Sequence, residues 1–190
     1  MKIGVYVGSF DPVHKGHLQV IEKLTEKYVD RILVIPTNSY WDKKLATTLK
    51  DRIAMLELCK KTNMTIAKKY SNTSFTYQIF DKLEKDYPED ELYLIIGSDN
   101  LKDFSKWKQV NKILKHHIIV VARTKIVLTD VLEETLPHNR FLLLSEFPYI
   151  EVSSSLIRKL IKEKDFKSLE DKLNPSVIEY IEKHKLYINS

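Results

Sequence analysis

The chain has 190 residues, of which 43% are apolar and 30% are charged, a composition typical of folded globular proteins that excludes a largely disordered one. Its 31 basic and 26 acidic side chains give a net charge of +5, but they are interspersed and form no concentrated basic stripe for nucleic acid. The single cysteine excludes an internal disulfide, and no apolar run reaches the ~18 residues of a membrane span.

The length suits one domain, and no Pro/Gly/Ser-rich linker divides the chain, so we expect a single unit over residues 1–190. The amino end reads as a strand rather than as a signal peptide, which together with the lone Cys59 favours the reducing cytoplasm. Cys59 falls in a helical pattern, where we expect a buried, inert thiol rather than a nucleophile.

Residues 2–28 predict a strand, a tight loop and a helix. An apolar, β-branched run gives way to Gly8-Ser9-Phe10-Asp11-Pro12, and an amphipathic segment follows over 17–28. A junction of this kind presents backbone N–H groups and the positive end of the helix dipole to a ligand. An anion fits there, and phosphate is the commonest one.

Two histidines follow that loop. His14 and His17 are separated by a lysine and by Gly16, which has no side chain to obstruct a ligand, and both rings can donate hydrogen bonds to phosphate. As an isolated pair they would be ordinary surface histidines, and without a third ligand nearby they do not close a zinc site. Their place directly after the loop favours phosphate binding.

The rest of the chain alternates apolar runs with helical patterns, and this alternation predicts an α/β fold. We expect a Rossmann-like, doubly wound parallel sheet with a small C-terminal helical portion. The predicted strands cover 31–36, 64–67, 91–96, 116–123 and 140–144. The predicted helices cover 49–61, 77–87, 129–136 and, after Asn174-Pro175, the stretch to His184.

Loops after the predicted strands carry candidate ligands. The strand over 91–96 runs into Gly97-Ser98-Asp99-Asn100, where a ribose or base is expected to cross the sheet edge, but a plain N-cap role competes for Asp99. Residues 73–76 predict a helix cap first and a binding loop second. Trp107 falls in the next helical stretch, where a core position competes with stacking on a ring. In the loop over 37–47, substrate contact and mere exposure are equally favoured for Tyr40, Trp41, Lys43 and Lys44.

The carboxyl quarter brings Ser153-Ser154-Ser155 to a helix start, with Arg158 about one turn inside. A cap by Ser154 or Ser155 would account for one hydroxyl. Three hydroxyls, an exposed helix start and an arginine pointing back toward it together predict a second anion site.

The block Gly-Ser-Phe-Asp-Pro-x-His-x-Gly-His directly after a strand resembles the signature of the nucleotidyltransferase superfamily. With Thr76, Gly97-x-Asp99, Trp107 and Ser153-Ser154-Ser155-x-Ile157-Arg158, nearly the whole chain resembles the bacterial nicotinate-nucleotide adenylyltransferases. The resemblance implies transfer of AMP from ATP to nicotinate mononucleotide, giving nicotinate adenine dinucleotide and pyrophosphate in NAD synthesis. It also implies Mg²⁺, bound mainly through the ATP phosphates rather than by protein ligands.

By matched position, the resemblance assigns roles to the candidate residues. It implies that His14, His17 and Arg158 contact the ATP phosphates, together with the backbone of Gly8, Ser9 and Phe10. It implies that Gly97, Asp99 and Ser154 meet the adenosine end, with Ser153 also binding substrate, and that Thr76 and Trp107 surround the nicotinate ring. Lys44 is carried over as a contact for the acceptor phosphate, although Trp41-Asp42-Lys43-Lys44 departs from the family's Pro-Pro-His-Lys pattern.

Two alternatives stay open. Val7-Gly8-Ser9 and the triple serine are also similar to the phosphopantetheine adenylyltransferases of coenzyme A synthesis, which lack the Gly-x-Asp…Trp arrangement. A non-catalytic nucleotide- or RNA-binding module would keep the fold without the chemistry. The expected partners are ATP and nicotinate mononucleotide, without nucleic acid or membrane. The sequence leaves open the choice between nicotinate and nicotinamide mononucleotide, and it is compatible with a homo-oligomer.

Overall fold

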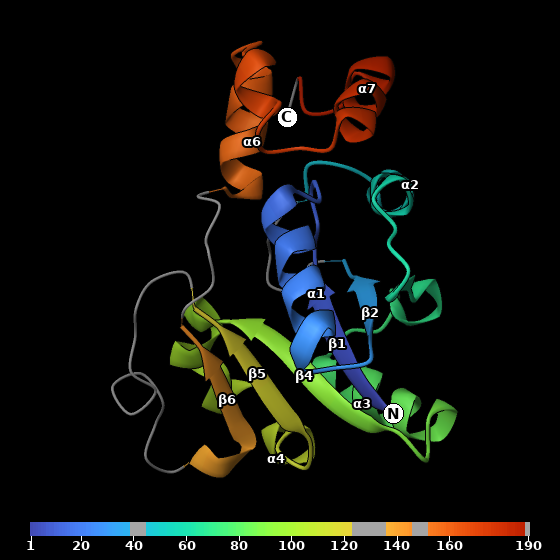
Figure 1. Cartoon of the computed structure of the whole chain (residues 1–190), viewed down its shortest axis with the longest axis vertical. Helices are drawn as coiled ribbons and strands as arrows, with labels where there is room; N and C mark the ends of the chain where they lie inside the picture. The colour runs from blue at the N-terminus through green and yellow to red at the C-terminus, as the bar shows by residue number, and fades with distance from the viewer. Residues whose placement is uncertain (39–44, 123–135, 146–151, 189–190) are drawn as a thin grey trace.

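Six parallel strands form one sheet in the order β3-β2-β1-β4-β5-β6 (Figure 1). The structure, a computed structural model, describes residues 1–38, 45–122, 136–145 and 152–188. The strands are β1 (Lys2–Gly8), β2 (Arg31–Pro36), β3 (Met64–Ile66), β4 (Glu91–Gly97), β5 (His117–Val121) and β6 (Phe141–Leu144). The chain winds outward from β1 to β3 and then from β4 to β6, which confirms the predicted doubly wound sheet.

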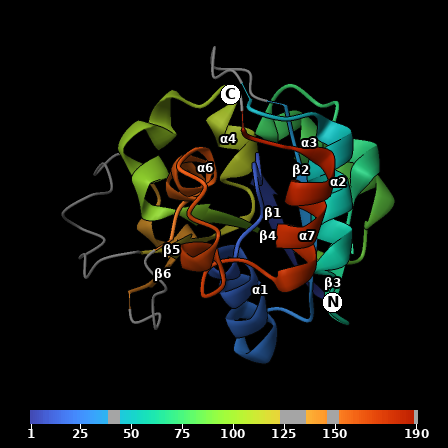
Figure 2. The ribbon, with the colours of Figure 1, turned by 90° about the horizontal axis from the view of Figure 1, so that it is seen from above.

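Helices connect these strands. The described α-helices are α1 (Lys15–Lys27), α2 (Leu49–Leu58), α3 (Thr76–Asp86), α4 (Val110–Ile113), α6 (Ser154–Lys162) and α7 (Pro175–His184). Short 3₁₀ helices span Lys68–Tyr70, Ser98–Lys106, His138–Arg140 and Lys167–Leu169. The last helices, α6 and α7, lie beyond the amino end of α1 and form the predicted C-terminal helical portion (Figures 1 and 2).

Both faces of the sheet are covered, which is why its strands read as continuous apolar runs rather than alternating ones. On one face α1, α2, α6 and α7 pack over side chains such as Val34 and Ile119. On the other face α3, α4 and the 3₁₀ helix Ser98–Lys106 pack over Val5 and Ile118. Because each layer has its own buried core, the carboxyl ends of the strands are held rigidly between them.

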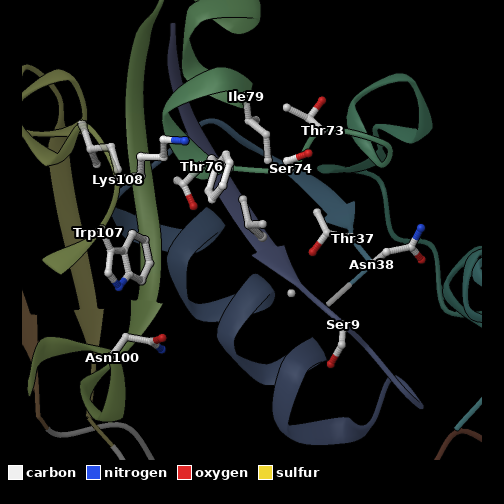
Figure 3. A pocket seen from close by; sticks show the side chains of 14 residues that line it. Ser9, Thr37, Asn38, Thr73, Ser74, Thr76, Ile79, Asn100, Trp107 and Lys108 are labelled. Carbon is white, nitrogen blue, oxygen red and sulfur yellow. The ribbon is translucent and has the colours of Figure 1, made fainter. Parts of the chain in front are cut away.

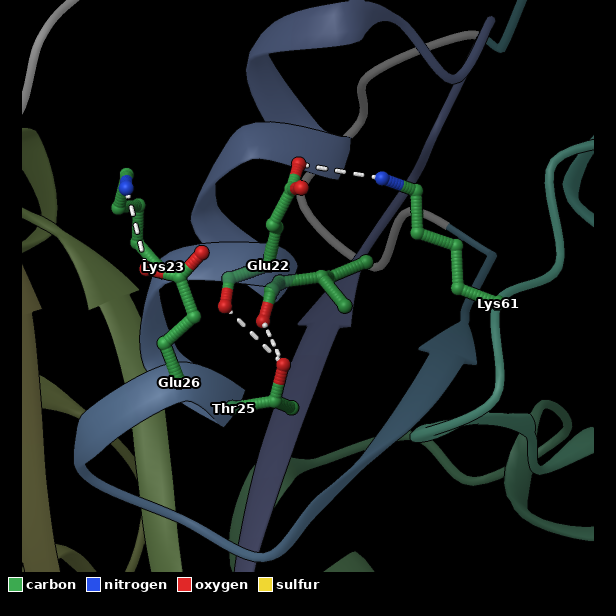
Figure 4. Close-up of polar contacts among 6 residues, drawn as sticks. Glu22, Lys23, Thr25, Glu26 and Lys61 are labelled. Atoms are coloured by element: carbon green, nitrogen blue, oxygen red, sulfur yellow. Dashed lines mark hydrogen bonds and ion pairs between the residues drawn. The ribbon is translucent and has the colours of Figure 1, made fainter.

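Helix α1 has a buried side and an exposed side, as the periodicity of its sequence predicts. Its buried residues are Leu18, Ile21 and Leu24. The other side of the helix carries exposed ion pairs, with Nζ to Oε2 distances of 3.0 Å for Lys23–Glu26 and 3.1 Å for Lys61–Glu22 (Figure 4). Exposed pairs contribute at most ~1 kcal/mol each, so the apolar stripe, rather than the charges, fixes α1 on the sheet.

Helices α1 and α6 begin earlier than the sequence predicts. Helix α1 begins at Lys15 because His14 takes the N-cap position, a role that periodicity does not reveal and that histidine rarely fills. Helix α6 is capped by Ser153, whose hydroxyl accepts from the backbone N–H of Leu156 at 3.1 Å. The expected cap at Ser154 or Ser155 was therefore wrong by one residue or more.

The segment after β4 differs from the prediction in two ways. Gly97, not Asp99, is the N-cap of the 3₁₀ helix Ser98–Lys106, so the plain N-cap role expected as a competitor for Asp99 is wrong. Trp107 follows the end of that helix instead of lying within a helix. Helix α2 ends at Leu58, before the predicted residue 61, because the chain must already turn for the carbonyl of Asn63 to accept from Ile32 N–H at 2.8 Å.

The structure bears on two further expectations. Cys59 is buried, and burial raises the pKa of its thiol to about 11, as expected for an inert thiol. No helix among the described residues is long and apolar enough to cross a membrane. Other predicted features lie outside the described residues, namely Tyr40, Trp41, Lys43, Lys44, the last residue of the strand over 116–123 and most of the helix over 129–136.

Candidate active site

Two cavities open at the carboxyl edge of the sheet, where the strand order reverses between β1 and β4. In parallel α/β folds this crevice is where ligands bind. One cavity, of about 380 Å³, contains both motif histidines, and we call it the histidine cavity. The other, of about 330 Å³, is lined by Thr37 and Thr73, and we call it the threonine cavity. Their common wall consists of Val7, Gly8, Ser9, Thr76, Asn100 and Trp107.

His14 and His17 hold each other at the start of α1. The backbone N–H of His14 donates to Nδ1 of His17 at 3.2 Å, and the N–H of His17 donates to Nδ1 of His14 at 3.3 Å. The two rings are stacked with centroids 3.7 Å apart. Because each Nδ1 accepts a hydrogen bond, each ring carries its donor hydrogen on Nε2. The start of α1 therefore brings both histidines and the positive end of a helix dipole to the histidine cavity.

The side chain of Phe10 packs against the ring of His17. Its ring is 2% exposed and meets the His17 ring edge-on, with centroids 4.9 Å apart. Phe10 has a φ of 48°, in the left-handed region that non-glycine residues seldom occupy. That conformation turns the loop after β1 so that the Phe10 side chain points into the core while the backbone stays at the cavity.

Gly16 has a packing role in addition to the one expected. A Cβ at this position would lie 3.0 Å from Nδ1 of His14 and 3.0 Å from Cγ1 of Val152. Val152 directly precedes Ser153, the N-cap of α6, and also lines the histidine cavity. The missing side chain thus permits close packing between the first turn of α1 and the segment before α6, rather than only the approach of a ligand.

The far wall of the histidine cavity comes from the end of β4. Gly97 and Asp99 both line it, together with the apolar Ile95. A Cβ on Gly97 would lie 2.4 Å from Oδ1 of Asp99, so the carboxylate folds back over the glycine. This arrangement places a carboxylate acceptor opposite the histidines, where it can bind hydroxyl groups of a ligand.

The threonine cavity is formed by separate segments that meet beside β1 (Figure 3). Thr37 and Asn38 follow β2, residues 73–76 lead into α3, and Trp107 follows the 3₁₀ helix. The inner side of Trp107 is supported by the buried Phe104 ring, with centroids 5.0 Å apart. An aromatic face and several hydroxyl and amide groups suit a flat ring that carries polar substituents.

Helix α6 is bonded directly to the turn after β1. The Ser154 hydroxyl donates to the carbonyl of Pro12 at 2.9 Å, and Nη1 of Arg158 donates to the carbonyl of Asp11 at 2.7 Å. Nη2 of Arg158 donates back to the Ser155 hydroxyl at 3.2 Å. The two elements predicted to bind anions are therefore in contact, although Pro12 and Ser154 are 142 residues apart in sequence.

Asp11 joins four parts of the chain and is 2% exposed. Its Oδ1 accepts from the Tyr187 hydroxyl at 2.8 Å, and its Oδ2 accepts from the backbone N–H of Ala46 at 2.7 Å, while its carbonyl binds Arg158. Burial raises the pKa of Tyr187, and the Asp11 carboxylate raises it further, so the phenol remains a donor. The C-terminal segment is thus tied to the turn that carries the histidines.

Arg52 is the functional-site residue that sequence reasoning missed most completely. It is fully buried, and its Nη1 donates to the carbonyls of Ser9 at 2.6 Å and of Thr37 at 2.8 Å. These carbonyls follow the adjacent strands β1 and β2. Arg52 therefore holds together the two loops that follow these strands, at the bottom of the two cavities. Burial lowers the pKa of Arg52 and Asp11 opposes that shift, but an arginine remains charged. The available signal was its place on the buried stripe with Met55 and Leu56.

The structure gathers most of the predicted site residues around the two cavities. Those that line at least one of them are Gly8, Ser9, Phe10, His14, His17, Thr76, Gly97, Asp99 and Trp107. Ser153, Ser154 and Arg158 instead bond to α6 and to the turn after β1. Lys44 lies outside the described residues. Thr73 and Asn38, which line the threonine cavity, fall in the predicted loops over 73–76 and 37–47, whereas sequence reasoning missed Lys108 there.

Comparison with known proteins agrees with this geometry. Residues 5–160 match the cytidylyltransferase-like family. The probable nicotinate-nucleotide adenylyltransferases of Endomicrobium trichonymphae and Flavobacterium johnsoniae are 33% and 34% identical to the chain, with 98% of this chain covered and 98% and 99% of theirs. The Plasmodium falciparum nicotinic acid mononucleotide adenylyltransferase complexed with NaAD superposes with a TM-score of 0.81 at 25% identity, covering 98% of this chain and 97% of that one. The chain belongs to the nicotinate-nucleotide adenylyltransferase family.

Proposed function

We propose that the chain transfers the adenylyl group of ATP to nicotinate mononucleotide, giving nicotinate adenine dinucleotide and pyrophosphate in NAD synthesis. The observation that supports this reaction best is the pair of cavities that share Gly8 and Ser9. Two substrates that must react with each other need adjacent sites with a common boundary. The similar Plasmodium protein, complexed with NaAD, binds a molecule in which both halves are joined.

In this proposal the histidine cavity takes ATP. The Nε2–H groups of His14 and His17 bind phosphate oxygens, together with backbone N–H groups of Gly8, Ser9 and Phe10. Arg158 adds positive charge from α6 by moving from its Asp11 contact toward the phosphates. Gly97 and Asp99 receive the adenosine end, with Ser153 and Ser154 near it.

The reaction then needs no nucleophile from the protein. An oxygen of the acceptor phosphate attacks the α-phosphorus of ATP in line, a new P–O bond forms, and the bond to the β-phosphate oxygen breaks. Negative charge moves onto the leaving pyrophosphate, where the histidine donors stabilise it. The protein also holds the two anions together, which repulsion would otherwise keep apart.

The threonine cavity takes nicotinate mononucleotide in the same proposal. Trp107 stacks on the nicotinate ring, Thr76 binds beside it, and the phosphate points toward Ser9 and the histidine cavity. Lys44 would approach that phosphate from the loop after β2. Arg52 holds Ser9 and Thr37 in place from beneath and touches neither substrate.

A divalent cation, which we propose to be Mg²⁺, would enter with ATP. The one carboxylate among the described residues that line the histidine cavity is Asp99, a donor set that suits a cation held mainly by phosphate oxygens. When bound, such a cation neutralises charge on the triphosphate. We further propose that residues 1–190 act as one nucleotidyltransferase domain in the cytoplasm.

The decisive experiment measures pyrophosphate release from ATP with three acceptors, namely nicotinate mononucleotide, nicotinamide mononucleotide and phosphopantetheine. We expect turnover with nicotinate mononucleotide and none with phosphopantetheine. Turnover with phosphopantetheine alone would show instead that the chain is a phosphopantetheine adenylyltransferase of coenzyme A synthesis. Salt-sensitive RNA binding without any pyrophosphate release would identify a non-catalytic module.

A further inference from the structure

The threonine cavity contains one charged side chain among its described lining residues, and that side chain is Lys108. Lys108 directly follows Trp107, whose backbone is extended with φ −64° and ψ 138°. The turn that carries both residues is closed by the N–H of Val110, which donates to the carbonyl of Trp107 at 3.1 Å. The cation and the indole are therefore presented to the same cavity from one fixed turn.

Lys108 is exposed, and its ammonium group lies at the border of this cavity. Its Nζ is 4.5 Å from the centroid of the Phe75 ring, which lines the same cavity. Figure 3 shows Lys108 beside Thr76 and Trp107, at the end of the cavity away from Ser9. A cation over a phenyl ring at a partly open site is held weakly, so it can turn to an anionic group without a large cost.

This position bears on how the acceptor is chosen. Nicotinate and nicotinamide mononucleotide have the same phosphate, ribose and pyridinium ring, and they differ only in a carboxylate against a neutral carboxamide. Stacking on Trp107 cannot distinguish them, and the hydroxyl of Thr76 can bond to either group. A nearby cation favours the carboxylate alone.

We propose that Lys108 is a specificity-determining residue that selects nicotinate mononucleotide by binding its carboxylate. This inference rests on the proposed function, and it adds the residue that determines which mononucleotide is accepted. The acceptor phosphate is the other anion that Lys108 could meet. That phosphate must reach the α-phosphorus of ATP beside Ser9, however, and Lys108 lies at the opposite end of the cavity (Figure 3).

The test compares Lys108→Met with the unchanged protein in pyrophosphate release, using nicotinate and nicotinamide mononucleotide as separate acceptors. Methionine keeps the aliphatic stem and removes the charge. We expect kcat/KM with nicotinate mononucleotide to fall about fivefold, and kcat/KM with nicotinamide mononucleotide to change less than about twofold. The loss should shrink at high salt, because salt screens an exposed pair, and Lys108→Arg should keep most of the preference.

Lys106→Met is the matched control, because Lys106 lies two residues away and pairs with Asp103 at 2.7 Å instead of lining the cavity. It should leave the preference unchanged. An equal loss with both acceptors in Lys108→Met would overturn the inference and point to the phosphate. An unchanged preference would also overturn it, while the proposed function would stand. Absence of pyrophosphate release from the unchanged protein with either mononucleotide would instead refute the proposed function.

Discussion

The histidine cavity and the threonine cavity share a wall but are built in different ways. The polar groups of the first come mainly from one stretch, residues 8–17, in which each histidine caps the other three positions away. Those of the second come from separate segments after β2, before α3 and after the 3₁₀ helix. Under the proposed assignment, phosphate binding is therefore encoded locally, whereas recognition of the acceptor depends on the topology that brings distant loops together.

The largest effect is expected in the histidine cavity. His17→Ala removes one Nε2–H donor, and we expect turnover to fall ~10²-fold or more with every acceptor, because the donor acts on the triphosphate. Steady-state pyrophosphate release measures this loss. The same change removes a cap from α1, at a cost of about 1 kcal/mol, so thermal unfolding must show that the variant is folded.

His184→Ala serves as the control for this variant, because His184 is exposed in α7 and stacks on Tyr180, with centroids 4.2 Å apart. It should keep normal turnover. A folded His17→Ala protein with near-normal turnover would remove the histidines from the reaction and would leave the local motif with a purely structural role.

The next effect should distinguish the two cavities. Trp107→Ala removes the stacking face, which is worth ~1–3 kcal/mol for aromatic stacking on a base, so KM for nicotinate mononucleotide should rise about tenfold. The KM for ATP should rise less, although Trp107 borders both cavities. Initial rates with each substrate varied in turn measure the two constants. Trp107→Phe should restore most of the loss, and equal rises in both constants would contradict the division of the site.

A smaller effect concerns the C-terminal segment, which Tyr187 bonds to Asp11 in the turn before the histidines. Tyr187→Phe removes the hydrogen bond to buried Asp11, so the free energy of unfolding should fall by ~1–3 kcal/mol. The turn should also loosen, and turnover should fall about threefold, a modest loss of positioning. Urea unfolding and pyrophosphate release give the two values.

Tyr180→Phe is a closely matched control, because the Tyr180 hydroxyl donates to the Asp51 carboxylate at 3.0 Å between α7 and α2. It should lower stability without changing turnover. If turnover falls equally in both variants, the C-terminal helices act only through global stability. The hydrogen bond from Tyr187 to Asp11 then has no separate effect on turnover.

The same contrast explains how much could be predicted from the sequence. The parallel sheet followed from buried apolar runs, and the histidine cavity followed from a motif whose members contact one another within a few residues. His14 as an N-cap was not predicted, because its role depends on ring geometry rather than on residue preference.

The threonine cavity was only partly predictable. Thr76 and Trp107 were identified through a resemblance, and Thr73 fell in the stretch 73–76 that the sequence offered as a helix cap first and a binding loop second. Lys108 carries no local signal, since cavity residues such as Phe75 are far away from it in sequence. Arg52 could have been identified as a charged residue on a buried helical stripe, yet its partners, the carbonyls of Ser9 and Thr37, depend on the pairing of β1 with β2. The pattern of side chains in a sequence does not show which backbone carbonyls will accept hydrogen bonds from a distant residue.

The smallest effect is expected at Cys59, which lines neither cavity. Burial raises the pKa of its thiol to about 11, so at pH 8 only ~10⁻³ of it is thiolate, against roughly a quarter for an ordinary cysteine. Iodoacetamide should therefore label the folded protein at least about a hundredfold more slowly than the urea-unfolded protein, and faster as the pH rises toward that pKa. Mass spectrometry measures the labelling, and turnover should stay unchanged throughout. Rapid labelling at pH 8 with loss of turnover would contradict this prediction, because it would show that Cys59 is accessible and lies close to the site.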